Sequence, residues 1–316
     1  MDHDQFNMFL GKYGIGIILI GMVVIIAIMK PMFIKPGNLL NIFTQISING
    51  LIAYGMCLAI TTGGIDLTCG AQLALVSCIL GQLVGKNSWG VLPAAVVAVV
   101  VAGFFGFMNG FLISKFDMFP FVVTLSMQLI VRSIAQIISN GQAVSMAEPT
   151  FKEIYSGKFF GVIPRPIIYL AVVVIIMYIV MHWTRFGRYV YAVGGNVNAA
   201  IASGVNVLWT KTLVYTISGV LAGLAGIIMT SKTGSAQSNI GVGYETDAVA
   251  ACVLGGTSFA GGISTAPGVL LGAIIIGCIY NGMNFLQINS YYQSLTKGVV
   301  IIGAVLLDMV MNKKNR

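Results

Sequence analysis

Residues 184–204 read TRFGRYVYAVGGNVNAAIASG. This segment carries two arginines, Arg185 and Arg188, and no acidic residue, whereas the stretches before and after it are strongly apolar. A Gly-Gly-Asn turn interrupts the segment, and Asn196 can cap a short helix that Gly204 ends. A polar and basic segment of this kind has to lie in water. It therefore divides a chain whose remaining length is predicted to lie in lipid.

The composition places the chain among the membrane proteins. Of its 316 residues, 57% are hydrophobic and 8% are charged, whereas a soluble domain carries about 25% charged residues. The formal net charge is +8, but the basic residues lie in short connections and at the C-terminus. This pattern predicts membrane orientation and contact with lipid headgroups, and it gives no reason to expect nucleic-acid binding. The five cysteines lack CxxC spacing and are expected to be apolar fillers.

The apolar stretches predict an all-α polytopic membrane protein with about ten transmembrane helices. The predicted passes are Gly14–Ile34, Asn41–Thr62, Leu67–Gly85, Val91–Ser114, Met118–Ile138, Ile167–Trp183, Trp209–Ser231, Ala248–Leu254, Gly268–Asn284 and Tyr291–Met309. The eighth is short, and either it begins earlier, near Tyr244, or it is broken. The whole chain, 1–316, is interpreted as one transmembrane domain in which residues 184–208 connect two halves.

A sequence pattern that occurs twice in the chain favours two related halves. Asn109-Gly110 closes the fourth predicted pass and Asn281-Gly282 closes the ninth, and transporters are often built from repeated halves. In a chain with 39 glycines, coincidence explains this pattern equally well.

Ten passes would put both termini on the same side as residues 184–208. The positive-inside rule places loops rich in Lys and Arg in the cytosol, and the C-terminal Lys313, Lys314 and Arg316 are basic as well. We therefore expect a multi-pass protein of the plasma membrane (the bacterial inner membrane) with both termini in the cytosol. The N-terminal MDHDQFN is acidic, so no cleavable signal peptide is expected.

Several chemistries lack the residues that they need. An ATP-binding P-loop requires GxxxxGK[ST], and the nearest string, Gly81–Asn87, is one residue short between its glycines and lacks the hydroxyl. The two histidines, His3 and His182, predict neither a His-rich metal site nor a Ser-His-Asp triad. The chain is expected not to be an enzyme and to have no cofactor or metal of its own.

Two polar stripes are candidates for a substrate pathway. Thr124, Gln128 and Arg132 share one face of the fifth pass and suit a hydroxyl-rich substrate. An Arg132 that reaches the outer headgroups explains this stripe at least as well. Gln45 and Asn49 form the second stripe, for which hydrogen bonding to a neighbouring helix is the alternative.

The positions of the acidic residues predict how transport is driven. The acids lie at the ends of predicted passes or at an outer edge, as do Asp66, Asp117, Asp308, Glu245 and Asp247. Ion-coupled carriers commonly use an acid within the membrane, so energy is expected to come from outside the chain. Lys297, near the start of the last pass, is interpreted as an anchor that reaches the headgroups.

Four motifs carry a family resemblance. GGIDLTCG (63–70), TRFGRYVYAVGGN (184–196), SGV (203–205) and YETDAVAACVLGGTSFAGG (244–262) resemble the permease subunits of sugar ABC importers, with the ribose/galactose branch most similar. The run SYYQSLTKGVVIIGAVLLD (290–308) is similar too, so the resemblance covers essentially the whole chain. It implies a homodimeric or pseudo-dimeric channel that receives a monosaccharide from an extracytoplasmic sugar-binding protein. A separate cytosolic ABC ATPase subunit would hydrolyse the ATP.

The resemblance also implies that residues 184–208 are the coupling loop that docks into the ATPase. The residues implied in this contact are Arg185, Phe186, Gly187, Arg188, Gly194, Gly195, Asn196, Ala199, Ala200, Ser203 and Gly204. The family pattern has an acidic and a basic residue after Gly-Gly-Asn, whereas this chain has VNAAIA (197–202). Docking is therefore expected to use apolar and backbone contacts together with the two arginines. An ordinary stop-transfer turn is the alternative.

Two rival functions stay open. An ion-coupled carrier would work without an ATPase. An ABC importer of another small polar solute, such as a nucleoside or a branched-chain amino acid, would keep the architecture and change the cargo.

Overall fold

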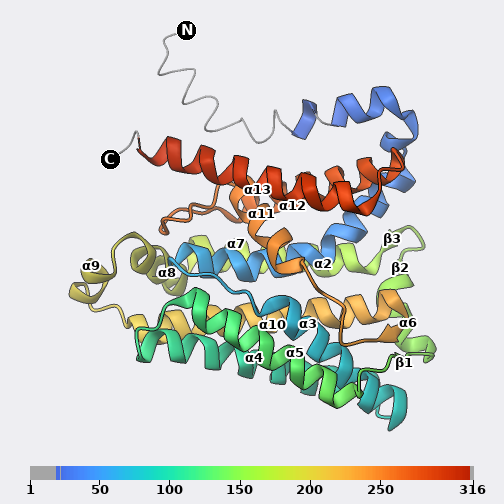
Figure 1. Ribbon diagram of the computed structural model, residues 1–316, viewed down its shortest axis with the longest axis horizontal. Helices are drawn as coiled ribbons and strands as arrows, with labels where there is room; N and C mark the ends of the chain where they lie inside the picture. The colour runs from blue at the N-terminus through green and yellow to red at the C-terminus, as the bar shows by residue number, and fades with distance from the viewer. Residues whose placement is uncertain (1–18, 22, 314–316) are drawn as a thin grey trace.

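The computed structural model describes residues 19–21 and 23–313, which form an elongated bundle of helices (Figure 1). The long helices are α2 (Pro36–Thr61), α4 (Val91–Lys115), α5 (Pro120–Ser139), α7 (Arg165–Trp183), α10 (Val207–Thr233), α12 (Ala266–Phe285) and α13 (Ser290–Lys313). The shorter helices are η1 (Pro31–Ile34), α3 (Cys69–Leu80) with its π-helical continuation η2 (Gly81–Lys86), α6 (Pro149–Ser156), α8 (Arg185–Gly195), α9 (Val197–Ala202) and α11 (Tyr244–Leu254). The all-α polytopic class is thereby confirmed.

Seven helices among the described residues are long and apolar enough to cross a membrane, instead of the predicted ten passes. They are α2, α3 with η2, α4, α5, α7, α10 and α12. The predicted first pass begins at Gly14, outside the described residues, and its described part is a short apolar helix over Leu19–Met29. α13 has 24 residues but is not among the seven, and its first turns, Ser290–Lys297, are polar.

Most helix boundaries lie close to the predicted ones, and the largest shift has a local cause. α2 begins at Pro36, five residues before the predicted Asn41, because a proline in the first turn loses no intrahelical hydrogen bond and has a φ suited to the helix. The same residue type opens α5 at Pro120. Apolar periodicity alone could not place the start of α2, since its first turn contains Gly37 and Asn38.

Glycines allow the longest helix contact in the bundle. α4 lies along α10, and Gly106 and Gly110 of α4 face the α10 main chain so closely that a side chain at either position would overlap Tyr215 or Thr212. Helices in lipid gain little from apolar burial and associate by such close packing. The α4–α10 pair therefore joins the segments before and after α8 and α9 into one body.

Two helices, α3 and α11, begin inside the bundle. The main chains of Gly70, near the start of α3, and Gly241, just before α11, touch each other, and Asp66 reaches Ser218, near the middle of α10. α11 has 11 residues, which is about 16 Å of helix against a hydrocarbon core of about 30 Å. The eighth predicted pass is thus a half-length helix that begins at Tyr244, and Figure 1 shows it short and central.

The connections gather at the two ends of the bundle (Figure 1). At one end, the polar connection Ser139–Arg165 is folded: it contains α6 and two small antiparallel pairs, β1 (Val144–Ser145) with β4 (Ser235–Ala236) and β2 (Lys158–Phe159) with β3 (Ile163–Pro164). At the other end lie α8 and α9, together with the C-terminal end of α13.

Candidate functional site

Residues 184–204 form two short capped helices. The Thr184 hydroxyl accepts the Gly187 amide at 3.1 Å and begins α8, and Asn196 Oδ1 accepts the Ala199 amide at 3.0 Å and begins α9. Gly204 has a φ of +80°; its amide and that of Val205 return to the last turn of α9, which is the Schellman form of helix ending. The predicted helix between Asn196 and Gly204 is confirmed. α8 was not predicted, because its glycines weaken the helical signal.

One face of α8 packs on the bundle and the other is basic. Gly187 lies against the carbonyl groups of Val180 and Met181 at the end of α7, whereas Arg185 and Arg188 are exposed. No acidic residue occurs between 184 and 244. The two helices therefore present a basic surface on a rigid base. Of the residues implied in docking, Ala200 is buried, while Ala199, Ser203 and Gly204 are exposed.

Two glycine pairs from distant parts of the sequence meet at the end of α8. We call Gly194, Gly195, Gly261 and Gly262 the glycine joint. A side chain built on Gly261 would lie 2.7 Å from Gly194 O, and one on Gly262 would lie 2.9 Å from Gly195 Cα. Gly261 and Gly262 have φ values of +83° and +74°, which L side chains rarely adopt. The contact is thus made main chain to main chain, without intervening side chains.

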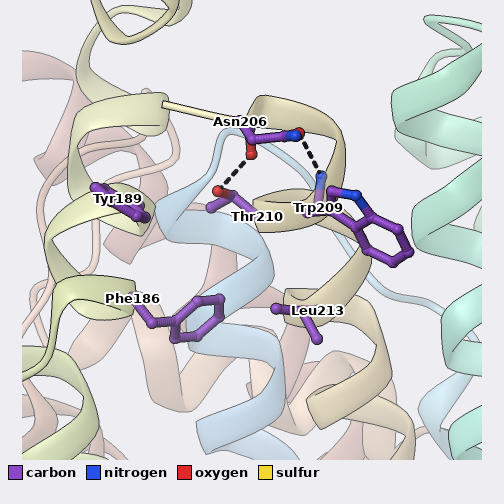
Figure 2. A pocket seen from close by; sticks show the side chains of 6 residues that line it. All are labelled: Phe186, Tyr189, Asn206, Trp209, Thr210 and Leu213. Carbon is purple, nitrogen blue, oxygen red and sulfur yellow. Dashed lines mark hydrogen bonds between the residues drawn. The ribbon is translucent and has the colours of Figure 1, made fainter. Parts of the chain in front are cut away.

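A shallow apolar groove separates α8 from α10, and Figure 2 shows its lining. Phe186 and Tyr189 of α8 form one wall, and Trp209 and Leu213 of α10 form the other, around a volume of about 260 Å³. The polar atoms of Asn206 are used locally, since its side chain accepts the Trp209 amide at 3.1 Å and its carbonyl accepts the Thr210 hydroxyl at 2.8 Å. The groove offers few free polar groups, so we place no sugar in it.

The stripe on α5 turns toward the bundle. Thr124 is fully buried and its hydroxyl bonds to Pro120 O at 2.9 Å, while Gln128 is half-buried. Arg132 neither extends along a polar face nor reaches outward: its Nη1 donates to Ser238 O at 2.8 Å and Ile240 O at 2.7 Å. Arg132 therefore ties α5 to the segment that precedes α11.

The stripe on α2 is partly exposed and lies elsewhere. Gln45 donates to Asn41 Oδ1 at 3.3 Å, and Asn49 is half-buried with its Oδ1 atom lacking a partner. α2 packs on α7, α10, α11 and α12, whereas α5 packs on α3 and α4. Within one chain the two stripes therefore lie on helices that are not direct neighbours.

Two of the acids expected at the ends of predicted passes, Asp66 and Glu245, are buried in the bundle. Asp66 is fully buried; its Oδ1 accepts the amide and hydroxyl of Thr68, and its Oδ2 accepts the Ser218 hydroxyl at 2.6 Å. Glu245 is buried beside Gly70 with one carboxylate oxygen lacking a partner. The motif that supplies Asp66 follows a break in helix α2, and the sequence could not show that this break folds back into the interior.

Lys297 was interpreted as a headgroup anchor, and this is also wrong. Its ammonium group forms an ion pair with Asp247, and the Tyr280 hydroxyl donates to the same carboxylate oxygen at 2.7 Å. The three residues come from α13, α11 and α12. Two basic side chains thus fix this region: Lys297 binds the first turn of α11, and Arg132 of α5 binds the segment before it.

Comparison with known proteins places these features in a family. The chain matches the family model described as branched-chain amino acid transport system / permease component over residues 38–305. It is 42% identical to the ribose import permease protein RbsC of Bacillus subtilis (strain 168), over 91% of this chain and 89% of that one. No solved structure shows a significant match.

Two further relatives cover almost the full length. The D-allose transport system permease protein AlsC of Escherichia coli (strain K12) is 38% identical, over 98% of this chain and 95% of its own. The galactose/methyl galactoside import permease protein MglC of the same strain is 33% identical, over 98% of this chain and 97% of its own.

Proposed function

The chain belongs to the family of branched-chain amino acid transport system / permease components, and we propose that it is the membrane-spanning subunit of an ABC importer. We propose a monosaccharide as the cargo of this importer. The observation that carries this proposal is the near-complete coverage by relatives named as ribose, allose and galactose permeases. The described helices agree with a multi-pass membrane protein. As a transport subunit, the chain would carry out no chemistry of its own.

In the proposed assembly the chain contacts an ATPase, a sugar-binding protein, a second permease copy and lipid. An ABC ATPase would dock on α8 and α9 and hold the ATP, an extracytoplasmic sugar-binding protein would deliver the sugar at the opposite end, and a second permease copy would complete the channel in surrounding lipid. Support for the ATPase site comes from the exposed Arg185 and Arg188 on helices fixed to the bundle. This arrangement makes the α8–α9 end cytosolic, and we propose the cytosolic side for both termini as well.

Two related halves are part of the proposal. In each half a long helix, α2 or α10, leads into an interior connection and then a helix that begins inside the bundle, α3 or α11. The reciprocal main-chain contact of Gly70 and Gly241 at these two starts supports the relation. The pathway would run between the halves or between copies, with Gln45 and Asn49 as the partly exposed polar candidates.

Asp66 and Glu245 are buried acids of the kind that an ion-coupled carrier could use. The experiment therefore has to distinguish transport driven by ATP from transport driven by an ion gradient. The chain is reconstituted in liposomes with the ATPase and binding protein encoded in its genome, and uptake of labelled ribose, allose and galactose is measured. We expect ATP-dependent uptake of at least one of them, together with ATP hydrolysis that the loaded binding protein stimulates. Uptake by the chain alone, driven by an ion gradient, would replace the importer by a carrier. Stimulation by a nucleoside or amino acid and by no sugar would change the cargo.

A further inference from the structure

We propose that the glycine joint transmits movement of α8 and α9 to the two connections that border this end of the bundle. The inference rests on the proposed function, since it takes α8 and α9 as the ATPase docking site. It adds the residues through which displacement of these helices passes into the membrane-spanning body. Gly194 and Tyr191 are the positioning residues in this account.

Gly194 lies on a hydrogen bond that joins two distant segments. The Gly262 amide donates to Thr61 O at 2.9 Å, and a side chain on Gly194 would overlap that same oxygen atom and crowd the amide. Thr61 is the last residue of α2, and Gly262 belongs to the connection between α11 and α12. A displacement of α8 toward the bundle therefore presses on the end of α2 and on this connection together.

Tyr191, one turn earlier in α8, forms a second link to the connection between α11 and α12. Its hydroxyl donates to Ser264 O at 2.9 Å. Burial, with a smaller contribution from Cys57, raises the pKa of Tyr191 to about 12, so the hydroxyl keeps its proton at physiological pH. The Ser264 hydroxyl lies 2.8 Å from Cys57 Sγ of α2 and 3.2 Å from the Thr257 hydroxyl. Tyr191 thus pulls on the connection where Gly194 pushes.

The segments that receive this movement form walls of a depression. The depression is open, has a volume of about 140 Å³ and is lined by Gly63–Ile65, Phe119–Phe121 and Phe259. Thr61 comes two residues before Gly63, and Gly261 comes two residues after Phe259. Two of the three walls are therefore directly continuous in the chain with the segments that Gly194 contacts. Because packed segments move as bodies and are not continuously deformable, a shift at the joint changes the width of this opening.

The first test is Gly194→Ala, which inserts a methyl group where none fits. The variant is assembled with the ATPase and binding protein, and three quantities are measured: ATPase association, sugar-stimulated ATP hydrolysis, and sugar uptake. We expect association to persist and uptake per ATP hydrolysed to fall by about tenfold, a usual size for a lost coupling between sites. Gly37→Ala is the control, because Gly37 is helical and has nothing within 4 Å of the added carbon.

The second test keeps the proposal falsifiable if Gly194→Ala does not fold. Tyr191→Phe removes one hydroxyl and its bond to Ser264, and uptake per ATP is expected to fall several-fold with association unchanged. Tyr178→Phe is the matched control, because Tyr178 is exposed on α7, outside the proposed docking helices.

Wild-type coupling in both Gly194→Ala and Tyr191→Phe would overturn the joint and leave the importer standing. Absence of ATPase association with the wild-type chain would overturn the proposed function itself. Loss of association in Tyr191→Phe would also overturn the joint, since the bond would then serve docking and not transmission.

Discussion

At the scale of single residues, breaking the ion pair of Lys297 and Asp247 tests how much this pair contributes to the stability of the protein. The side chains are 21% and 10% exposed, so little water can replace a lost partner. Lys297→Gln leaves the Asp247 carboxylate with only the Tyr280 hydroxyl and the surrounding dipoles. We expect a loss of about 2 kcal/mol of stability, less than the roughly 3–5 kcal/mol for breaking a fully buried pair because these side chains keep some exposure, measured as a lower Tm in detergent.

The double variant Lys297→Gln/Asp247→Asn identifies the cause of that loss. Removing both charges leaves no unpaired carboxylate, so we expect most of the lost stability to return, as it does when both members of a buried pair are replaced. Lys86→Gln is the control, because Lys86 is exposed. A double variant no more stable than Lys297→Gln would show that packing, and not charge, holds α13 against α11.

The sequence placed such residues on faces but could not assign their partners. Arg132 does turn toward the bundle, as does the rest of its stripe. The atoms that accept its hydrogen bonds belong to Ser238 and Ile240, which lie 106 and 108 residues away in the sequence. Asp66 and Ser218 are 152 residues apart. Periodicity reports which side of a helix a residue occupies, and only the tertiary packing decides what that side meets. This is why the headgroup interpretation of Lys297 was wrong and the burial of Asp66 and Glu245 was not foreseen.

At the scale of elements, the cap of α9 tests whether this helix must be folded to dock. Asn196→Ala removes the acceptor for the Ala199 amide, and an N-cap of this kind contributes about 1 kcal/mol. For a six-residue helix that loss is large enough to fray it, so we expect several-fold weaker binding of the ATPase in a pull-down assay. Asn198→Ala is the matched control, because Asn198 is exposed within the same helix and Ala favours helix. Equal binding by the two variants would remove α9 from the interface.

The two arginines of α8 give a second prediction at this scale. Arg185→Glu with Arg188→Glu reverses the charge of a surface that has no acidic residue nearby in the sequence, and we expect ATPase association to drop at least about tenfold at low salt, with a smaller effect at high salt because ions screen exposed charges. Lys152→Glu with Lys158→Glu makes the same charge change at the opposite end and should leave association unchanged. Intact association in the arginine variant would assign docking to apolar and backbone contacts alone.

The elements were more predictable than the site. Seven apolar helices and the capped helix after Asn196 follow from composition, periodicity and cap chemistry, which act locally. α8 and α11 were less visible, because α8 is rich in glycine and α11 is too short for an apolar stretch of membrane length. The glycine joint lies beyond local reasoning altogether, since Gly-Gly pairs that meet in space look the same in sequence as pairs that only form turns.

At the scale of the whole molecule, the fold separates two functional ends. α8, α9 and the glycine joint lie at one end, while α6 and the small β-pairs lie at the other (Figure 1). An importer needs this polarity, because the binding protein and the ATPase work on opposite sides of the membrane. The α4–α10 contact connects the two ends through helices that run the length of the bundle, so displacement at one end can change the other without large internal rearrangement.

Site-specific labelling tests this polarity. The five native cysteines are buried, so an introduced exposed thiol can be labelled with a membrane-impermeant maleimide over a low background. Lys158→Cys, in β2, should react in intact spheroplasts, and Asn198→Cys, in α9, should react only after permeabilisation, because the proposed ATPase site has to face the ATP supply. The reverse pattern would place α8 and α9 outside and remove them as the ATPase site. Labelling of both thiols in intact spheroplasts would contradict the placement of these residues on opposite sides of the membrane. It would also contradict the transmission of movement from α8 through Gly194 into the bundle.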